Sequence, residues 1–316
     1  HIYYTFKHCL NSRLRCRVTP IAIILNACKR GKTVLYETQE FNELLADYIH
    51  GATVLTGKLL QMIADLIEPG PRALDDLKRV YELLQQAHPE MVSLSKAVWL
   101  ILRGIRAGKS PRTASHELQE RWNENIVSVV EMSANYLMKH HNPHILTISY
   151  SGLVRDAILE LKRRKAIPQV YVGEGRPRYE GLTLARELAG NDISCTVFAD
   201  AAFSGFLGEI DCVLIGADAV GPASILNKIG TTAILREAKI REIPTAAAYD
   251  FLKVVDENGF PDEITEYSPE ELMADSVAQQ IAEEAKDFEH IRLVNRYFEV
   301  VPRGLVDTEL ADVTLR

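Results

Sequence analysis

The chain has 316 residues, of which 47% are hydrophobic and 25% charged, and its formal net charge is −7 at pH 7. A chain of this length exceeds one typical domain, and it can bury a sizeable core without disulfide or metal cross-links. The acidic balance argues against broad nucleic-acid binding, so we expect no direct nucleic-acid partner. No run approaches the ~18 apolar residues of a membrane-spanning helix, so no membrane association is expected either.

The five cysteines are irregularly spaced and fit neither a zinc pattern nor a disulfide framework. The sequence therefore predicts no metal site, and a reducing, cytoplasmic location fits best. Residues 1–35 are rich in Lys and Arg, with no acidic residue before Glu37. We interpret them as an irregular leader or a mis-assigned start.

Residues 36–140 have the periodicity of helices. Leu59, Leu60 and Ile63 recur three and four positions apart, which places them on one helix face. Further helical segments are expected at residues 77–86, 95–106 and 114–138. No strand-like alternation competes with them, so the sequence predicts an all-helical domain here.

Residues 141–316 alternate short apolar runs with amphipathic segments. Strands are expected at 145–148, 170–172, 195–198, 212–215, 245–248 and 297–301, and helices at 153–165, 182–188, 228–241 and from Ser268 to about Phe288. Such alternation is typical of an α/β fold, here a Rossmann-like, mainly parallel sheet with helices on both faces. The first strand is not followed by Gly-x-Gly-x-x-Gly, so the sequence predicts no nicotinamide or other cofactor.

In an open parallel sheet, ligands bind beyond the carboxyl ends of the strands. Ser149 and Ser151 follow the first expected strand, where hydroxyls and helix N–H groups can hold a phosphate, although simple helix capping explains them equally well. Arg176 and Arg178 follow the second strand beside glycines. They can grip a phosphate with two parallel hydrogen bonds, or lie in a surface turn as solvated charges.

Two further segments carry candidate residues. Asp218 ends an apolar run, where an acid serves as a helix cap or as a general acid/base. Asn227 and Lys228 are expected to open the next helix, where they form a credible anion site or belong to a capped helix with an exposed lysine. Taken together, these segments favour a phosphorylated small ligand, either a sugar phosphate or a nucleotide.

Several motifs resemble, in this order, a family that unites sugar-1-phosphate isomerases with regulatory subunits of initiation factor 2B. The motifs, which span about residues 45 to 310, are His50-Gly51-Ala52, Ile145-Leu146-Thr147 with Ser149-Tyr150-Ser151, Glu174 with Arg176-Pro177 and Glu180-Gly181, Gly216-Ala217-Asp218, Asn227-Lys228-Ile229-Gly230-Thr231 and Phe298-Glu299-Val300-Val301-Pro302. The most specific of them is the Asn-Lys-Ile-Gly-Thr string.

The resemblance implies roles for these residues. In the isomerases a cysteine after the first strand and the Asp of Gly-Ala-Asp move protons as an aldose 1-phosphate becomes a ketose 1-phosphate. Asp218 keeps the second position, but Ser149 stands where the cysteine is expected, and a serine hydroxyl is a far weaker acid than a thiol. His50, before Gly51 and Ala52, replaces the arginine of the family's Arg-Gly-Ala and lacks a guanidinium's fixed fork.

Two hypotheses follow. In the first, the chain is an initiation-factor-2B-like protein that binds a sugar phosphate or nucleotide in a regulatory role. Arg176, Arg178, Asn227 and Lys228 then hold the phosphate, and Asp218 a sugar hydroxyl. In the alternative, the chain is an aldose–ketose isomerase, with Asp218 as the acid/base and Ser149 or a water completing the proton relay. The resemblance also implies a homo-oligomer, formed mainly through the sheet domain.

Overall fold

The computed structural model describes residues 34–47, 51–70, 72–261, 263–273, 279 and 290–313. Most of the expected leader at 1–35 therefore lies outside the described residues, and so does His50. None of the helices that the structure describes is long and apolar enough to cross a membrane.

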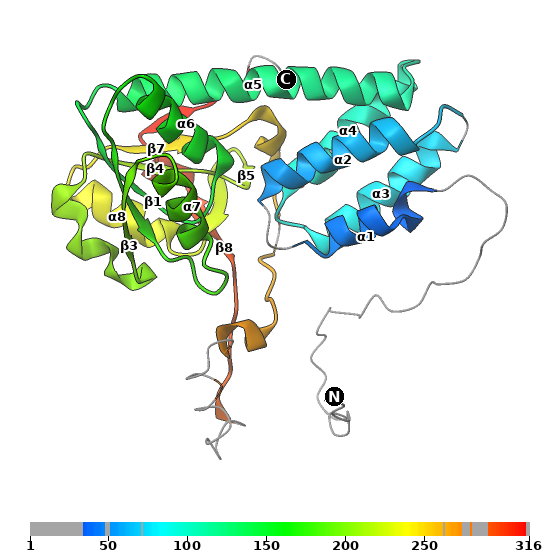
Figure 1. Cartoon of the computed structure of the whole chain (residues 1–316). Coiled ribbons are helices and arrows are strands. Elements are labelled where there is room, and N and C mark those ends of the chain that lie inside the picture. The colour runs from blue at the N-terminus through cyan, green and yellow to red at the C-terminus, as the bar shows by residue number, and fades with distance from the viewer. Residues whose placement is uncertain are drawn as a thin grey trace. The chain divides into compact units, whose positions relative to one another are not determined.

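The described chain before residue 140 is helical, as expected from its periodicity (Figure 1). The helices are α1 (Gln39–Leu45), α2 (Ala52–Leu66), α3 (Ala73–Ala87), α4 (Val92–Arg106) and α5 (Pro111–Leu137). Apolar residues at helical spacing face one core, in which Leu59, Ile63 and Leu77 are fully buried. Helix α5 begins where local chemistry favours a helix start, because Ser110 accepts a hydrogen bond from the amide of Thr113 and Pro111 follows it.

Helix α5 is shared between the helical part and the sheet part. It is 27 residues long and runs across the top of the molecule in Figure 1. Leu118 and Trp122 pack in the core of the helical part, whereas Val129 and Leu137 pack against the sheet. One continuous helix therefore contributes to both cores.

The main sheet has six strands in the order β3-β2-β1-β4-β7-β9, and every described pairing in it is parallel. The strands are β1 (His144–Thr147), β2 (Gln169–Gly173), β3 (Ser194–Phe198), β4 (Cys212–Ile215), β7 (Thr245–Ala248) and β9 (Thr308–Leu310). Strand β9 was not predicted from the sequence. The order reverses between β1 and β4, which makes the gap beyond their carboxyl ends the expected ligand crevice.

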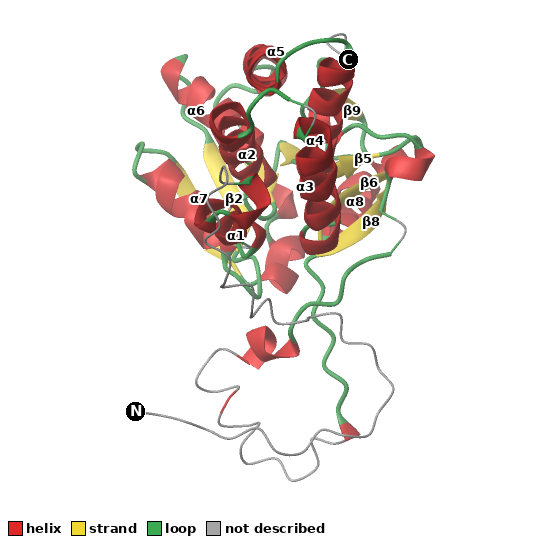
Figure 2. Cartoon of the chain, turned by 90° about the vertical axis from the view of Figure 1, so that its right-hand side faces the viewer, coloured by secondary structure: helices red, strands yellow, loops and turns green. Residues whose placement is uncertain are grey.

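Helices cover both faces of this sheet, which confirms the predicted Rossmann-like fold class. Helices α5, α6 (Gly152–Arg163) and α7 (Glu180–Ala189) pack on one face, and α8 (Thr231–Ile240) packs on the other. Adjacent residues of β1 point to opposite faces, with Ile145 in the first core and Leu146 in the second. Figure 2 looks from the side of the helical part, so that α2, α3 and α4 lie in front of the yellow strands.

A second, three-stranded sheet corrects part of the sequence interpretation. It consists of β5 (Ala219–Val220), β6 (Ser224–Lys228) and β8 (Phe298–Pro302), and both pairings are antiparallel. Asn227 and Lys228 therefore end a strand instead of opening a helix. The helix α8 starts three residues later, because Gly230 takes a left-handed conformation (φ +101°) that turns the chain between the two elements.

The predicted helix from Ser268 to about Phe288 is described only at its start. Residues Pro269–Met273 form a short 3-10 helix, η6. Most of the following residues up to 289 lie outside the described part of the chain.

Candidate functional site

Asp218 lies at the carboxyl edge of the main sheet, between β4 and β5. Its backbone amide donates to the carbonyl oxygen of Leu226, which fixes the residue against β6. The side chain is partly buried, and burial raises the pKa of its carboxyl to about 6, with Lys253 opposing the shift most strongly. A carboxyl with such a pKa exchanges a proton readily near neutral pH, as a general acid/base requires.

The loop after β1 meets the loop after β4. Ser151 caps α6 by accepting a hydrogen bond from the amide of Val154. A Cβ atom placed on Gly216 would lie only 2.6 Å from the Oγ atom of Ser151, so these loops pack too closely for a side chain there. Ser149 adopts a positive φ of 64°, a conformation uncommon for serine and frequent at functional turns. Ser149, Ser151 and Asp218 thus lie at the ends of adjacent strands.

The N-terminus of α2 approaches the same edge. Gly51 is its N-cap residue and Ala52 its first helical residue. A Cβ atom on Gly51 would be 3.8 Å from the carbonyl oxygen of Tyr150, which places Gly51 against the β1–α6 loop. Gly51, about 100 residues earlier in the chain, therefore lies against the loop that carries Ser149 and Ser151.

Lys228 is buried and paired. Its side chain is 4% exposed, and its Nζ lies 2.9 Å and 3.1 Å from the two carboxylate oxygens of Glu180, at the start of α7. The ammonium also lies 5.5 Å from the ring centroid of Tyr297. From the sequence, Lys228 was expected either to form part of an anion site or to be an exposed lysine. The second alternative is wrong, because the side chain is buried.

Asn227 organises the turn that precedes α8. Its Nδ2 donates to the hydroxyl of Thr231, which in turn donates to the carbonyl oxygen of Lys228. At the first turn of α8, the amide of Thr232 donates to the carboxylate of Glu299. A protein carboxylate thus already uses one of the helix amides that we expected to bind a ligand anion.

Arg176 and Arg178 follow β2, as predicted, but both contact protein groups. Arg178 donates through Nε to the hydroxyl of Tyr297 and pairs with Glu271 at 2.6 Å. Arg176 donates to the carbonyl oxygen of Leu272, and its guanidinium lies over the ring of Tyr179. The two arginines therefore connect the β2–α7 loop to the segment around residues 271–272.

Lys253 is a candidate that sequence reasoning missed. It ends the 3-10 helix η4 (Phe251–Lys253), which begins three residues after the end of β7, and it is 5% exposed. Among the described residues, no hydrogen bond or ion pair to its ammonium occurs, although Lys253 is the charged group that acts most strongly on Asp218. A buried cation without a bonded partner is costly, so this lysine indicates an anionic ligand. Its position just after the expected strand at 245–248 was the available signal, because ligand-binding residues of a parallel sheet lie beyond its strand ends.

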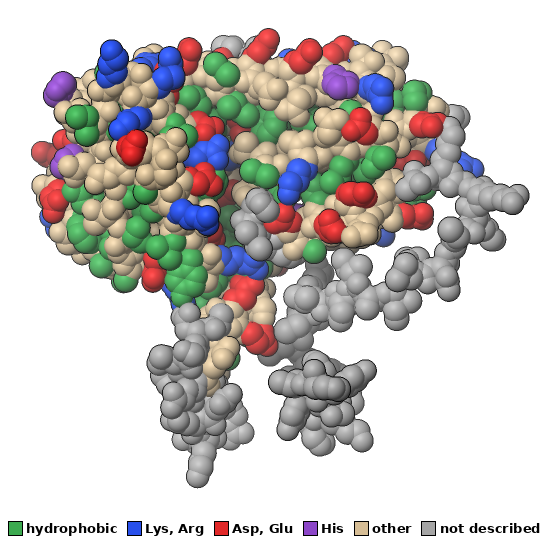
Figure 3. All heavy atoms as spheres, viewed as in Figure 1, with side chains coloured by type: hydrophobic (Ala, Val, Ile, Leu, Met, Phe, Trp, Pro, Cys, Tyr) green, Lys and Arg blue, Asp and Glu red, His purple; other side chains and the backbone are tan. Residues whose placement is uncertain are grey.

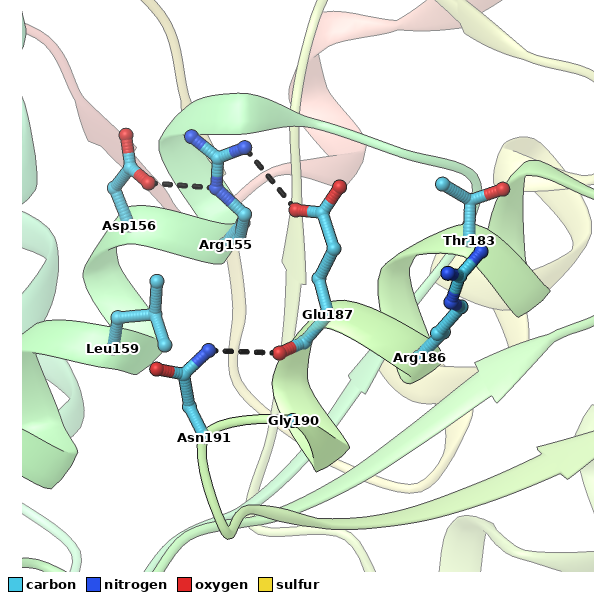
Figure 4. Close-up of a pocket in the computed structure, with 8 residues that line it drawn as sticks. All are labelled: Arg155, Asp156, Leu159, Thr183, Arg186, Glu187, Gly190 and Asn191. Atoms are coloured by element: carbon cyan, nitrogen blue, oxygen red, sulfur yellow. Dashed lines mark hydrogen bonds and ion pairs between the residues drawn. The ribbon is translucent and has the colours of Figure 1, made fainter.

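Two cavities in the described structure are lined by other residues and do not include Asp218. A cavity of about 530 Å³ lies between α6 and α7, and there Arg155 bonds to both Asp156 and Glu187 (Figure 4). A groove of about 1010 Å³ runs past Trp99 on α4 and does not include Asp218. Figure 3 shows acidic and basic side chains gathered around the hollow between the helical part and the sheet part.

The fold and the candidate site define an α/β protein with a carboxyl of raised pKa and two buried lysines at the switch point of its sheet. The family model for the initiation factor 2 subunit family matches residues 41–314, and the chain belongs to this family.

Among the relatives, the chain is 24% identical over 252 residues to a ribose 1,5-bisphosphate isomerase of Archaeoglobus fulgidus, covering 76% of this chain and 75% of that one. It is 27% identical over 247 residues to the ribose 1,5-bisphosphate isomerase of Methanocaldococcus jannaschii, covering 76% of each chain. Among solved structures, the translation initiation factor eIF-2B of Pyrococcus horikoshii superposes with a TM-score of 0.72 at 23% identity. That superposition covers 86% of this chain and 94% of the other, and it supports the fold.

Proposed function

We propose that the chain is an aldose–ketose isomerase that acts on a sugar 1-phosphate of the ribose 1,5-bisphosphate type. One observation carries the proposal. The carboxyl of Asp218, whose pKa is raised to about 6 by burial, lies at the strand-order reversal within the influence of the buried cations Lys253 and Lys228. Asp218 provides a group that moves protons, and Lys253, whose ammonium has no bonded partner among the described residues, provides positive charge that attracts a phosphorylated substrate.

The reaction needs one proton in and one proton out. Asp218 in its acid form donates a proton to the ring oxygen as the bond from that oxygen to C1 breaks. Ser149 or a water takes the proton from C2, and the electron pair of that C–H bond forms a C1=C2 double bond. The proton is then returned to C1 as the hydroxyl on C2 becomes the ketone carbonyl and its own proton returns to Asp218. The composition of the sugar is unchanged, and Asp218 ends in the form in which it began.

The neighbouring groups have separate roles in this proposal. Lys253 binds a phosphoryl group, since its ammonium has no bonded partner among the described residues. Asn227 and Lys228 shape the floor of the site, and Gly51 and Ala52 offer backbone amides at the N-terminus of α2. Ser149 or a water completes the transfer of hydrogen between C2 and C1.

The comparisons reverse the order of the two hypotheses drawn from the sequence. The regulatory hypothesis came first there because Ser149 replaces the expected cysteine. The relatives named ribose 1,5-bisphosphate isomerase, however, share about three quarters of their length with this chain. The regulatory role remains a second candidate, favoured by the fact that no described base is hydrogen-bonded to Ser149.

The test is to incubate the purified protein with ribose 1,5-bisphosphate and, separately, with methylthioribose 1-phosphate and AMP. Binding is followed by calorimetry and ketose formation in the same samples. Conversion of a sugar 1-phosphate supports the isomerase. Tight binding without conversion supports the regulatory role, and the absence of binding to all three contradicts both candidates.

We predict that Asp218→Asn abolishes turnover, a loss on the order of a thousandfold or more, while the dissociation constant for the substrate changes little. The amide keeps the shape of the side chain but cannot exchange the proton. Asp211→Asn is the matched control, since Asp211 bonds to the amide of His144 at the opposite edge of the sheet. Equal turnover in Asp218→Asn and the wild type would eliminate Asp218 as the proton carrier.

We also propose that the chain forms a homo-oligomer. Light scattering across a range of protein concentrations tests this, and a monomer at every concentration would contradict it.

A further inference from the structure

Glu90 is a buried carboxylate in the turn between α3 and α4. It is 1% exposed, although it belongs to the helical part of the chain and lies far in sequence from the other site residues. Its two oxygens accept hydrogen bonds from the backbone amide of Thr265 at 2.8 Å and from the hydroxyl of Tyr267 at 3.0 Å. Among the described residues, no basic side chain forms an ion pair with it. A buried carboxylate bound only by neutral donors is costly, so a stability role alone explains it poorly.

The contacts of Glu90 continue to the cationic residues of the site. The ring of Tyr267 stacks on that of Tyr297, with centroids 3.8 Å apart and planes 12° from parallel. The hydroxyl of Tyr297 accepts a hydrogen bond from Arg178 at 2.7 Å, and Lys228 lies over its ring. A single set of contacts therefore connects a turn of the helical part with the loop after β2 and the end of β6.

Glu90 also acts on Asp218 through its charge. Four charged groups from different elements act on the Asp218 carboxyl through their charge, namely Lys253 from η4, Glu90 from the α3–α4 turn, Lys228 from β6 and Glu180 from α7. The two lysines lower its pKa, and the two acids raise it. Glu180 is neutralised by its contact with Lys228 at 2.9 Å, whereas the described contacts of Glu90 carry no positive charge.

We propose that Glu90 is a positioning residue for the isomerisation, which holds residues 265–267 and the Tyr267–Tyr297 stack against the site and places a negative charge beside Asp218. It acts through Asp218 and Tyr267 and does not itself touch the substrate. The inference rests on the proposed function, but its electrostatic part is measurable without turnover.

Two variants separate the two effects. Glu90→Gln removes the charge and keeps an oxygen that accepts from the amide of Thr265. Tyr267→Phe keeps the ring stack and the charge of Glu90 but removes the hydroxyl. The matched control is Glu209→Gln, because Glu209 accepts a hydrogen bond from the hydroxyl of Tyr171 at 2.7 Å and is not among the groups that act on Asp218.

The first measurement is the carboxyl ¹³C titration of Asp218 in the whole protein, assigned with Asp218→Asn. In Glu90→Gln the midpoint should fall by about half a pH unit or more, since a like charge has been removed. In Tyr267→Phe and in Glu209→Gln it should stay within about 0.2 units of the wild type. An unchanged midpoint in Glu90→Gln would overturn the proposal.

The second measurement is the kinetics with ribose 1,5-bisphosphate. The alkaline limb of kcat/KM, where Asp218 loses the proton that it donates, should move to lower pH with the midpoint in Glu90→Gln. Tyr267→Phe should raise KM by about three- to tenfold with little change in kcat, because Arg178 and Lys228 are held less firmly. An unchanged KM in Tyr267→Phe would show that the hydrogen bond between Glu90 and Tyr267 does not help to hold Arg178 and Lys228 in place. If the wild type converts nothing, the proposed function fails, while the titration still decides whether Glu90 acts on Asp218.

Discussion

Asp218 is both partly buried and, at neutral pH, ionised, and this combination lowers the stability of the folded protein. Its burial favours the protonated form, and in the ionised form its carboxylate is solvated less well than in the unfolded chain. Lys253 and Lys228 offset only part of this cost, so the pKa stays raised from 3.8 to about 6. The proposed catalytic group is thus held in a less stable charge state at neutral pH, which is typical of acid/base residues.

This combination predicts how stability depends on pH. The folded protein binds the Asp218 proton more tightly than the unfolded chain, so stability falls as the pH rises from about 4 to about 6 and this loss is complete above that range. Asp218→Asn removes the charge. We therefore compare the free energy of unfolding of the variant with that of the wild type at two pH values. The difference, variant minus wild type, should be larger at about pH 7.5 than at about pH 4.5 by on the order of 1–2 kcal/mol.

Urea unfolding at the two pH values measures this difference, and a pH-independent difference between the proteins would contradict the raised pKa.

Ser149 offers the second residue-scale prediction. Its backbone conformation, with φ of 64°, sets the direction of its side chain irrespective of whether the γ atom is oxygen or sulfur. We expect Ser149→Cys to raise kcat by about tenfold, since a thiol holds and releases a proton much nearer neutrality than a hydroxyl does. Ser194→Cys, on the exposed start of β3, is the control for adding a thiol. A Ser149→Cys variant slower than the wild type would show that Ser149 serves only to shape the turn.

At the scale of the element, β6 and α7 are joined by a buried ion pair. Lys228, on β6, is almost entirely buried, and its described ion-pair partner is Glu180 at the start of α7. The pair fixes the start of this helix against the second sheet. Gly181 makes the approach possible, because a Cβ atom there would overlap the carbonyl oxygen of Gly173 at 1.7 Å.

We predict that Glu180→Gln lowers the free energy of unfolding by about 2–3 kcal/mol, since it leaves the Lys228 ammonium buried without a counter-charge. Glu187→Gln on the same helix is the matched control. Glu187 pairs with Arg155, but its side chain is 42% exposed. The control should cost less than about 1 kcal/mol. Equal effects of the two substitutions on denaturant unfolding would refute the distinction between them.

At the scale of the whole described structure, α5 connects the two cores, and one side chain on it connects three segments. Asn125 is fully buried, accepts a hydrogen bond from the amide of Phe251 and donates to the carbonyl oxygen of Asp312. Phe251 begins η4, which ends at Lys253. The helix that joins the helical part to the sheet therefore also supports the loop that carries a candidate ligand-binding lysine.

Asn125→Ala removes the acceptor of the buried amide of Phe251 and the hydrogen bond to the carbonyl oxygen of Asp312, so we expect it to cost about 2–4 kcal/mol of stability and to weaken binding of ribose 1,5-bisphosphate. Asn135→Ala, also on α5, is the control, because Asn135 is exposed and its described side-chain hydrogen bond is with Arg164. It should change stability by less than about 0.5 kcal/mol. Thermal unfolding measures the change in stability, and calorimetry measures the change in binding. Unchanged binding by a folded Asn125→Ala protein would show that the position of η4 does not affect the ligand site.

The sequence by itself determined the local structure and the chemical types of the candidate site residues. Periodicities near 3.6 and short apolar runs depend on neighbouring residues, so the helices up to residue 137 and the strands of the main sheet other than β9 could be predicted. So could the position of Asp218 and the serines, because the strand ends of a parallel sheet meet at one edge.

Only the tertiary structure determined which charged side chains act on Asp218 and which of them form ion pairs. It placed Asn227 and Lys228 in a strand and not in a helix, because β6 is defined by its pairing with β8, at least 70 residues later in the chain. It also brought Glu90 and Lys253 to Asp218, across more than 120 positions in the first case. Such contacts between distant segments depend on how whole elements pack, and no local pattern in the sequence records them.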